Sequence, residues 1–217
     1  MGLSPIAHAG QVVGKLELPG APDRAPVETR GFLDRAENAL APVRPVSITP
    51  YLLVALEATG GARPTAPPQV IWDLVGDSFA KPVIGVPVGT EVSIKNVSRI
   101  ARTLVAAGDA TLIQGGPINP TGSKSIRVTE PKIFTISDPD APYLKGRLVV
   151  VNTAYLSSVD EAGKFEIADV PEGSYKLRVF YKDAWLDGET DVKVGPKGKT
   201  DVNPKVPSLG SPGPAKK

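Results

Sequence analysis

The sequence contains no cysteine, and its 217 residues include a single histidine, His8. Without cysteine the chain has no disulfide, no thiolate nucleophile and no zinc–thiolate site. With one histidine near the N-terminus, catalysis by a Ser–His or Cys–His pair would depend on that residue alone. Long apolar runs are missing too, because no segment approaches the roughly 20 residues that span a bilayer. These absences predict a protein that is not an enzyme and has no transmembrane span.

An excess of charge of either sign is also absent. The chain has 25 basic and 23 acidic residues and a formal net charge of +2. This near-balance gives no long-range attraction to nucleic acid or to an anionic membrane. The basic Lys216 and Lys217 at the C-terminus are too few to form a polybasic membrane anchor. We therefore expect neither nucleic acid nor a membrane surface as a partner.

The N-terminal segment Ala7-His8-Ala9 resembles an A-x-A cleavage site at the end of a signal peptide. The residues before it lack a charged region and most of an apolar region. Residues 1–9 are therefore interpreted as the remnant of a signal peptide or as a disordered arm. The first interpretation predicts an exported protein, located in the periplasm or outside the cell.

Glycine and proline are abundant, with 22 and 23 residues, and they separate short apolar alternations. This pattern is typical of many short strands joined by tight turns, in a sandwich or a barrel. The unbroken apolar run 148–151 predicts a strand covered on both faces. The segments expected as strands are 10–18, 51–57, 69–74, 81–86, 91–96, 102–106, 125–129, 132–137, 148–151, 164–167, 175–179 and 192–194.

Two turn-plus-strand segments stand near the C-terminus, at 160–165 and 170–177. Together they resemble the carboxypeptidase regulatory-like domain, a transthyretin-like β-sandwich. Such domains are usually accessory, so the resemblance implies a fold and no activity.

Residues 86–92, the strand that ends at Asn96, and residues 149–155 carry a second resemblance. They are similar to the cupredoxin-like part of bacterial proteins called methylamine-utilisation-like. The two resemblances together imply an all-β chain, with a cupredoxin-like β-sandwich followed by a small transthyretin-like β-sandwich. The division expected is a cupredoxin-like sandwich at 10–145 with a proline-rich insertion at 21–50, a carboxypeptidase regulatory-like sandwich at 146–206, and a disordered tail at 207–217.

In metal-binding members of the cupredoxin-like family, a histidine lies six residues after the asparagine that corresponds to Asn96, and a Cys-x-x-His-x-x-Met pattern precedes the last strand. The corresponding residues here are Arg102, Asp138, Ala141 and Leu144. A blue-copper site needs two imidazoles and a thiolate, and a permanently charged arginine repels a cation. The resemblance therefore implies a copper site that has lost its ligands, and no cofactor. We expect Arg102 to pair with Asp138 at the vacated position.

Other candidate sites are weaker. Asp138 and Asp140 supply two carboxylates that a calcium ion accepts, although a solvated Asp-Pro-Asp turn is the alternative. Several aromatic side chains are candidates for binding a sugar ring or a protein, although such residues also fill cores. These candidate binding residues are Trp72, Trp185, Tyr143 and Tyr155.

These observations predict a non-catalytic accessory or structural subunit of a bacterial cell-envelope assembly. It would bind protein partners through its loops and strand edges, and strand addition is one mode of binding. Two alternatives stay open, a carbohydrate-binding module and a calcium-binding envelope protein.

Overall fold

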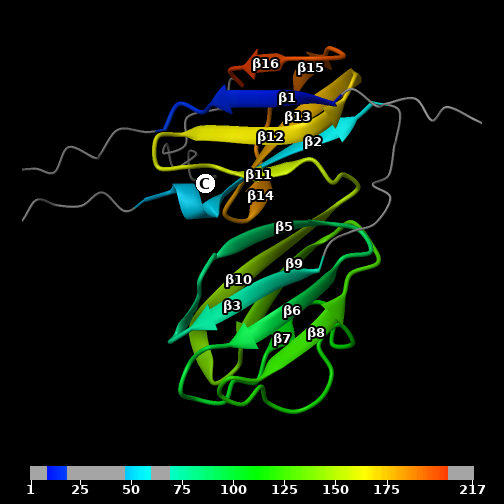
Figure 1. Ribbon diagram of the computed structural model, residues 1–217. Helices are drawn as coiled ribbons and strands as arrows, with labels where there is room; N and C mark the ends of the chain where they lie inside the picture. Colours follow the sequence, from blue (N-terminus) through cyan, green and yellow to red (C-terminus); the bar gives the residue numbers. More distant parts are fainter. Residues whose placement is uncertain (1–8, 19–46, 60–68, 205–217) are drawn as a thin grey trace, which may run out of the picture.

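The computed structural model describes residues 9–18, 47–59 and 69–204, and these residues confirm the predicted all-β class (Figure 1). They form strands β1 to β16 and one short 3-10 turn, Thr49–Tyr51. The described part of the chain includes no helix long and apolar enough to cross a membrane. The predicted arm at 1–9 lies outside the described residues except for Ala9, which belongs to a strand. Most of the predicted insertion at 21–50 and the predicted tail at 207–217 also lie outside them.

Residues 70–151 form one β-sandwich, which we call the inserted sandwich. Its first sheet has the order β4-β3-β6-β8 and its second the order β5-β10-β9-β7. The first sheet consists of β3 (Val70–Val75), β4 (Ser78–Phe79), β6 (Glu91–Asn96) and β8 (Ser123–Arg127). The second consists of β5 (Val83–Pro87), β7 (Val105–Ala106), β9 (Ile133–Asp138) and β10 (Ala141–Val151).

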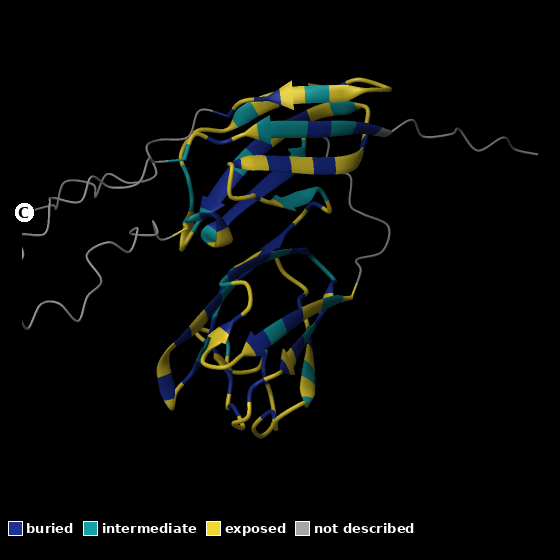
Figure 2. Ribbon diagram, turned by 60° about the vertical axis from the view of Figure 1, so that its left-hand side comes forward, coloured by how far each residue is buried: buried dark blue, intermediate teal, exposed yellow. Residues whose placement is uncertain are grey.

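Alternation along the strands builds the core of the inserted sandwich. In β6, Val92 and Ile94 are buried while Ser93 and Lys95 face outward, because successive side chains in a strand point to opposite faces of its sheet. Trp72 lies in the same core, stacked on Phe79 with ring centroids 4.1 Å apart. Figure 2 shows this alternation of buried and exposed residues along the strands of both sandwiches.

The remaining strands form a second sandwich, which we call the host sandwich. One sheet, of order β12-β1-β16, contains β1 (Ala9–Lys15), β12 (Lys164–Pro171) and β16 (Lys199–Val202). The other, of order β11-β2-β13-β14 with β15 also on β13, contains β2 (Leu52–Ala58), β11 (Leu156–Ser158), β13 (Gly173–Tyr181), β14 (Ala184–Trp185) and β15 (Thr190–Val194).

The strand pairing differs from the division expected at residue 146. The N-terminal strands β1 and β2 pair with β12 and β13 of the host sandwich, and β10 belongs to the inserted sandwich up to Val151. Strands β2 and β11 form an antiparallel pair with Ala55 opposite Leu156, and the Thr153 hydroxyl donates to the Leu56 carbonyl at 2.6 Å. The inserted sandwich therefore lies in the chain between the two arms of a β-hairpin of the host sandwich.

The predicted strand at 148–151 is buried on both faces, as expected. Leu148 and Val150 point into the core of the inserted sandwich. Val149 and Val151 point the other way, into a cluster with side chains of the host sandwich. The residues of this cluster, which we call the junction, are Leu53, Val83, Val149, Val151 and Phe180. The apolar run thus joins the two sandwiches.

Glycine at position 85 lets β5 approach β2 closely at the junction. A Cβ atom on Gly85 would lie 2.4 Å from Cδ2 of Leu53, well inside van der Waals contact. At the margin of the junction, Arg147 of β10 donates from Nε to Asp183 at 2.7 Å and from Nη1 to the Thr135 hydroxyl at 2.6 Å. The two sandwiches are therefore held together by apolar packing with an ion pair beside it.

Two local predictions are wrong. No strand was expected between 137 and 148, but β10 already begins at Ala141, with a bulge in its pairing to β9 between Ala141 and Lys145. The segment 102–106 was expected as a strand, but only β7 (Val105–Ala106) forms, and Arg102 makes an isolated bridge with Ile118.

Candidate functional site

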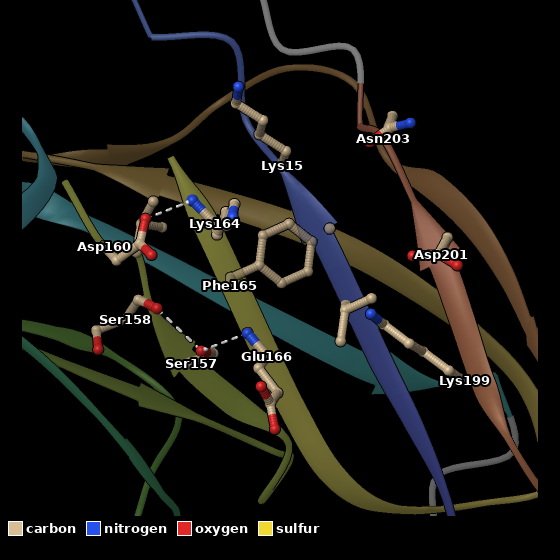
Figure 3. A pocket seen from close by; sticks show the side chains of 13 residues that line it. Lys15, Ser157, Ser158, Asp160, Lys164, Phe165, Glu166, Lys199, Asp201 and Asn203 are labelled. Atoms are coloured by element: carbon tan, nitrogen blue, oxygen red, sulfur yellow. Dashed lines mark hydrogen bonds between the residues drawn. The ribbon is translucent and has the colours of Figure 1, made fainter. Parts of the chain in front are cut away.

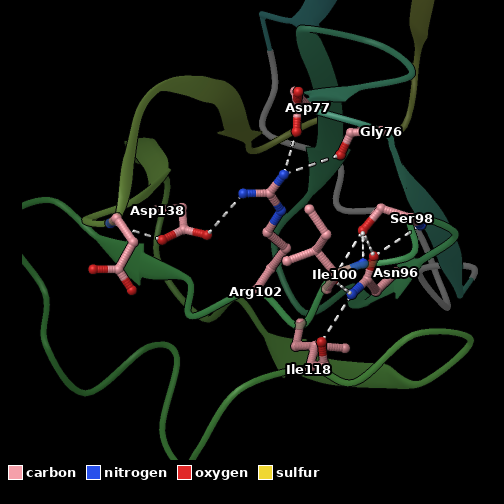
Figure 4. A network of polar contacts seen from close by, with 9 residues as sticks. Gly76, Asp77, Asn96, Ser98, Ile100, Arg102, Ile118 and Asp138 are labelled. Carbon is pink, nitrogen blue, oxygen red and sulfur yellow. Dashed lines mark hydrogen bonds and ion pairs between the residues drawn. The ribbon is translucent and has the colours of Figure 1, made fainter.

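The end of β6 positions the candidate site through the fully buried Asn96. Its Nδ2 donates to the carbonyls of Ile100 and Ile118, both at 2.8 Å. Its Oδ1 accepts from the backbone amide of Ser98 at 2.9 Å and from the Ser98 hydroxyl at 2.6 Å (Figure 4). Asn96 thus closes the loop that follows β6, and the backbone of Arg102 pairs with Ile118 beside it.

The side chain of Arg102 is only 7% exposed, and carboxylates lie on two sides of it (Figure 4). Nη2 donates to Asp77, in the turn between β3 and β4, and lies 3.5 Å from the Gly76 carbonyl. Nη1 lies 3.8 Å from Oδ2 of Asp138, at the end of β9. The predicted pairing of Arg102 with Asp138 is therefore confirmed, and Asp77 is a second partner that was not predicted.

The carboxylate of Asp138 is 2% exposed, and it has an ion-pair partner at one oxygen and a hydrogen bond at the other. Oδ2 faces Arg102, and Oδ1 accepts the backbone amide of Asp140 at 3.0 Å. A buried charge is tolerated only where it is paired and hydrogen-bonded. Asp77, Arg102 and Asp138, which we call the arginine network, therefore tie together the β3–β4 turn, the loop after β6 and the β9–β10 turn.

The four positions that correspond to copper ligands are all buried at this end of the inserted sandwich. Ala141 and Leu144 are 1% and 0% exposed and belong to the same apolar core. Neither has an electron-pair donor, and the guanidinium of Arg102 places a positive charge where a cation would bind. The residues present do not fit a copper ion.

The two carboxylates suggested for calcium are also not arranged as a metal site. Asp138 is bonded to Arg102, while Asp140 is exposed. Within the described ranges no group of three or more His, Cys, Asp or Glu side chains is gathered to hold a metal. A calcium ion, which takes six to eight oxygen ligands, gains no specific support from this geometry.

The four aromatic candidates lie in different surroundings. Trp72 is 1% exposed in the core, and its Nε1 donates to the Lys81 carbonyl at 2.8 Å. Trp185 is half-buried, with its ring edge against Phe180 and Arg178 4.6 Å above it. These two tryptophans therefore serve packing.

The two tyrosines differ from each other as well. Tyr155 is half-buried, edge-on to Tyr175 with ring centroids 5.9 Å apart, and its burial raises the pKa of its hydroxyl. Tyr143 is 68% exposed on β10. The structure does not bring the four aromatic candidates together into a platform for a sugar.

Exposed apolar side chains accompany the arginine network. Val75 directly precedes the Gly76–Asp77 turn, and Val97 donates its amide to Leu74 beside it. Val105 pairs with Ser137, next to Asp138. We call the set flanking the network the apolar rim, and it consists of Val75, Val97, Ile100, Val105 and Tyr143, which are 50%, 51%, 59%, 40% and 68% exposed. Among them the sequence pointed only to Tyr143, as an aromatic binding candidate, because alternation does not distinguish an outward valine from an inward one at the end of a sheet.

A separate hollow of about 560 Å³ lies on the host sandwich (Figure 3). Its wall carries three lysines and three acidic residues, so it has no net charge of either sign. Two of its polar groups are used locally, since Asp160 accepts the amide of Lys164 at 2.8 Å and the Ser157 hydroxyl accepts that of Glu166 at 3.3 Å. None of the residues predicted to bind a ligand lines this hollow.

No protein-family model matches the chain, and no curated protein matches it. Among solved structures, a reduced amicyanin variant is 19% identical, over 45% of this chain and 92% of its own, with a TM-score of 0.35. A purple cupredoxin from Nitrosopumilus maritimus is 14% identical, over 38% of this chain and 100% of its own, with a TM-score of 0.35. A Cu(I) amicyanin variant is 20% identical, over 38% of this chain and 82% of its own, with a TM-score of 0.36. These three structures are cupredoxins, and each is similar to less than half of this chain.

Proposed function

We propose that the protein is a non-catalytic accessory or structural component of a bacterial cell-envelope assembly, in the periplasm or outside the cell. It binds a protein partner through the apolar rim at the end of the inserted sandwich. The observation that carries this proposal is the arginine network, flanked by exposed apolar side chains. Two of its residues, Arg102 and Asp138, stand at positions that the cupredoxin-like resemblance assigns to metal ligands.

The chemistry of the buried residues supports binding and not catalysis. The guanidinium of Arg102 has no acceptor atom and serves neither as a base nor as a nucleophile, and the carboxylate of Asp138 is paired with it. Ala141 and Leu144 supply no reactive group. The buried side chains at this end thus have a structural task, which is to hold the surrounding turns in place.

The exposed residues have the character of a protein contact. Interfaces are enriched in aromatic and large apolar side chains, and tyrosine is a frequent source of binding energy. Tyr143 projects from the bulged part of β10, while Ile100 stands on the loop that Asn96 closes. Because the network fixes the turns that carry these residues, a partner loses little affinity to ordering them.

Photo-crosslinking in the native envelope tests the proposal. A crosslinking residue is placed at Tyr143 and, as a matched control, at the exposed Lys164 of the host sandwich. The proposal predicts one protein crosslinked from position 143 and not from position 164. The same protein, purified, should bind the Tyr143→Ser variant at least tenfold more weakly than the wild type, a loss of about 1.4 kcal/mol.

Two results would contradict the proposal. One is equal binding of the wild type and a Tyr143→Ser, Ile100→Ser double variant by the captured protein. The other is a Lys164→Ser variant that binds as weakly as the rim variants, which would place the contact on the host sandwich.

A further inference from the structure

The loop between β14 and β15 contains Asp187-Gly188, the single Asp-Gly step of the sequence, which has no Asn-Gly step. Both residues are exposed, and Gly188 has a positive φ of 101°. The loop is anchored on either side, because Leu186 donates its amide to Val179 at 2.8 Å and Thr190 pairs with Leu177. Between these anchors, the amide of Gly188 donates to no backbone carbonyl among the described residues.

We propose that Asp187 is a site of spontaneous isomerisation to isoaspartate in the folded protein. The nitrogen of Gly188 attacks Cγ of the protonated Asp187 carboxyl, forming an N–Cγ bond. The C–OH bond breaks, and the hydroxyl leaves with the amide proton as water. Water then adds at the former main-chain carbonyl carbon of the succinimide. The bond from that carbon to the Gly188 nitrogen breaks and the nitrogen takes a proton, which gives isoaspartate with a free α-carboxyl. The sequence of steps needs water alone and no oxidant or reductant.

Two features of the loop favour this reaction at this residue. Glycine has no Cβ to hinder the approach of its nitrogen to the neighbouring carboxyl, and it gives the chain the freedom to reach the cyclising conformation. An exposed loop between strands also changes conformation at low cost, because few contacts must be broken. The carboxylate of Asp187 makes no hydrogen bond or ion pair with the described residues, so nothing in them holds it away from the amide.

Asp77-Ser78 is a built-in comparison, because it too is an exposed aspartate followed by a small residue. Its carboxylate is held by Arg102, and Ser78 belongs to β4, where it pairs with Val75. The carboxylate and the following backbone amide, which react with each other in the cyclisation, are therefore both restrained at Asp77-Ser78. At Asp187-Gly188 neither group is held by a hydrogen bond to the described residues. Structure as well as sequence predicts which of the two sites reacts.

Isomerisation adds one methylene to the backbone between the two anchors of the loop. Glu189 follows immediately, and its carboxylate binds Lys176 at 2.7 Å and lies 3.7 Å from Arg178, which covers Trp185. A longer backbone displaces this carboxylate. In molecules that have reacted with time, the ion pairs of Glu189 beside Trp185 would therefore be weakened.

The test is peptide mapping of the intact, folded protein after incubation in mildly acidic buffer, with fragmentation that distinguishes isoaspartate from aspartate. Isoaspartate, with its succinimide precursor lighter by one water, should accumulate at Asp187 at least tenfold faster than at Asp77. The Asp187→Glu variant should show none at this position, because a six-membered ring forms far more slowly. Accumulation at Asp187 no faster than at Asp77, or an unchanged signal in the Asp187→Glu variant, would overturn the proposal.

Discussion

Two charged residues of the arginine network, Arg102 and Asp138, are buried, while the third, Asp77, is exposed. Breaking a buried pair by removing one partner leaves an uncompensated charge, whereas replacing both partners with apolar groups is often neutral. Asp138 is nearly inaccessible, and Arg102 is its charged neighbour. The stability of this end of the inserted sandwich should therefore depend on the pair as a unit.

The Arg102→Met variant should lose roughly 3–5 kcal/mol of unfolding free energy, because Asp138 is then buried without a cation. The Arg102→Met, Asp138→Leu double variant should recover most of that loss. Urea unfolding followed by tryptophan fluorescence measures both. Asp77→Asn is the control, with an expected loss below about 1 kcal/mol, because Asp77 is 64% exposed. An Arg102→Met variant that is as stable as the wild type would contradict the prediction.

Glu189 provides a test by titration. Its hydrogen bond from Lys176 and the charge of Lys176 hold the pKa of the Glu189 carboxyl below its usual value. A depressed pKa means that the pair contributes above the unfolded-state pKa of glutamate, about 4.3, and that the contribution is lost as pH falls through the lower folded value. In the Lys176→Met variant the Glu189 pKa should rise, as read from its carboxyl NMR signal. An unchanged pKa would mean that the pair does not form in solution.

At the scale of elements, the junction depends on close approach of β5 to β2. Gly85→Ala places a Cβ against Leu53, and overpacking of this kind typically costs about 1–3 kcal/mol. Adding Leu53→Ala should restore part of the loss, so the two changes should not be additive in thermal unfolding. Gly116→Ala is the matched control, because nothing lies within 4 Å of the added atom. Additive effects of Gly85→Ala and Leu53→Ala would show that the two residues do not touch.

The local pattern of apolar and polar residues predicted many of the strands but little of how the strands pair with one another. The strand at 91–96 matches β6, and the strand at 132–137 nearly matches β9, because alternation reports which face is buried. The strand at 51–57 was also expected, but its assignment to the cupredoxin-like part was not supported by its pairing with β13. Alternation identifies a buried face and says nothing about which distant strand will lie beside it.

The candidate site could likewise be predicted only in part from the sequence. The pairing of Arg102 with Asp138 followed from the resemblance, since both replace ligands that would converge on one ion. Asp77 was not predictable, because its turn reaches Arg102 only through the packing of two strands. The exposure of Val97 and Ile100 likewise results from a loop closed by the hydrogen bonds of Asn96.

At the scale of the whole molecule, the hairpin origin of the insertion predicts an independent host sandwich. The test uses a chain in which an Asn-Gly turn replaces residues 60–152. Leu53→Ser and Phe180→Ser are added so that the junction residues left exposed are polar. This chain should fold. The expected results are a β-type circular dichroism spectrum and a cooperative thermal transition. If this chain gives neither result, the host sandwich needs the inserted one in order to fold. A chain with the same deletion but without the two serine substitutions should aggregate.

The position of the insertion also bears on how the protein is made. During synthesis β1 and β2 emerge from the ribosome long before the strands with which they pair. Ala55 of β2 lies opposite Leu156 of β11, and β1 pairs with β12. Meanwhile the inserted sandwich has all its strands within one continuous stretch and can close first, as domains do during synthesis. The early strands then carry unsatisfied apolar faces through that interval. The nascent chain is consequently most vulnerable to misassembly before β11 emerges, and a slow or paused translation of the inserted part would prolong that danger.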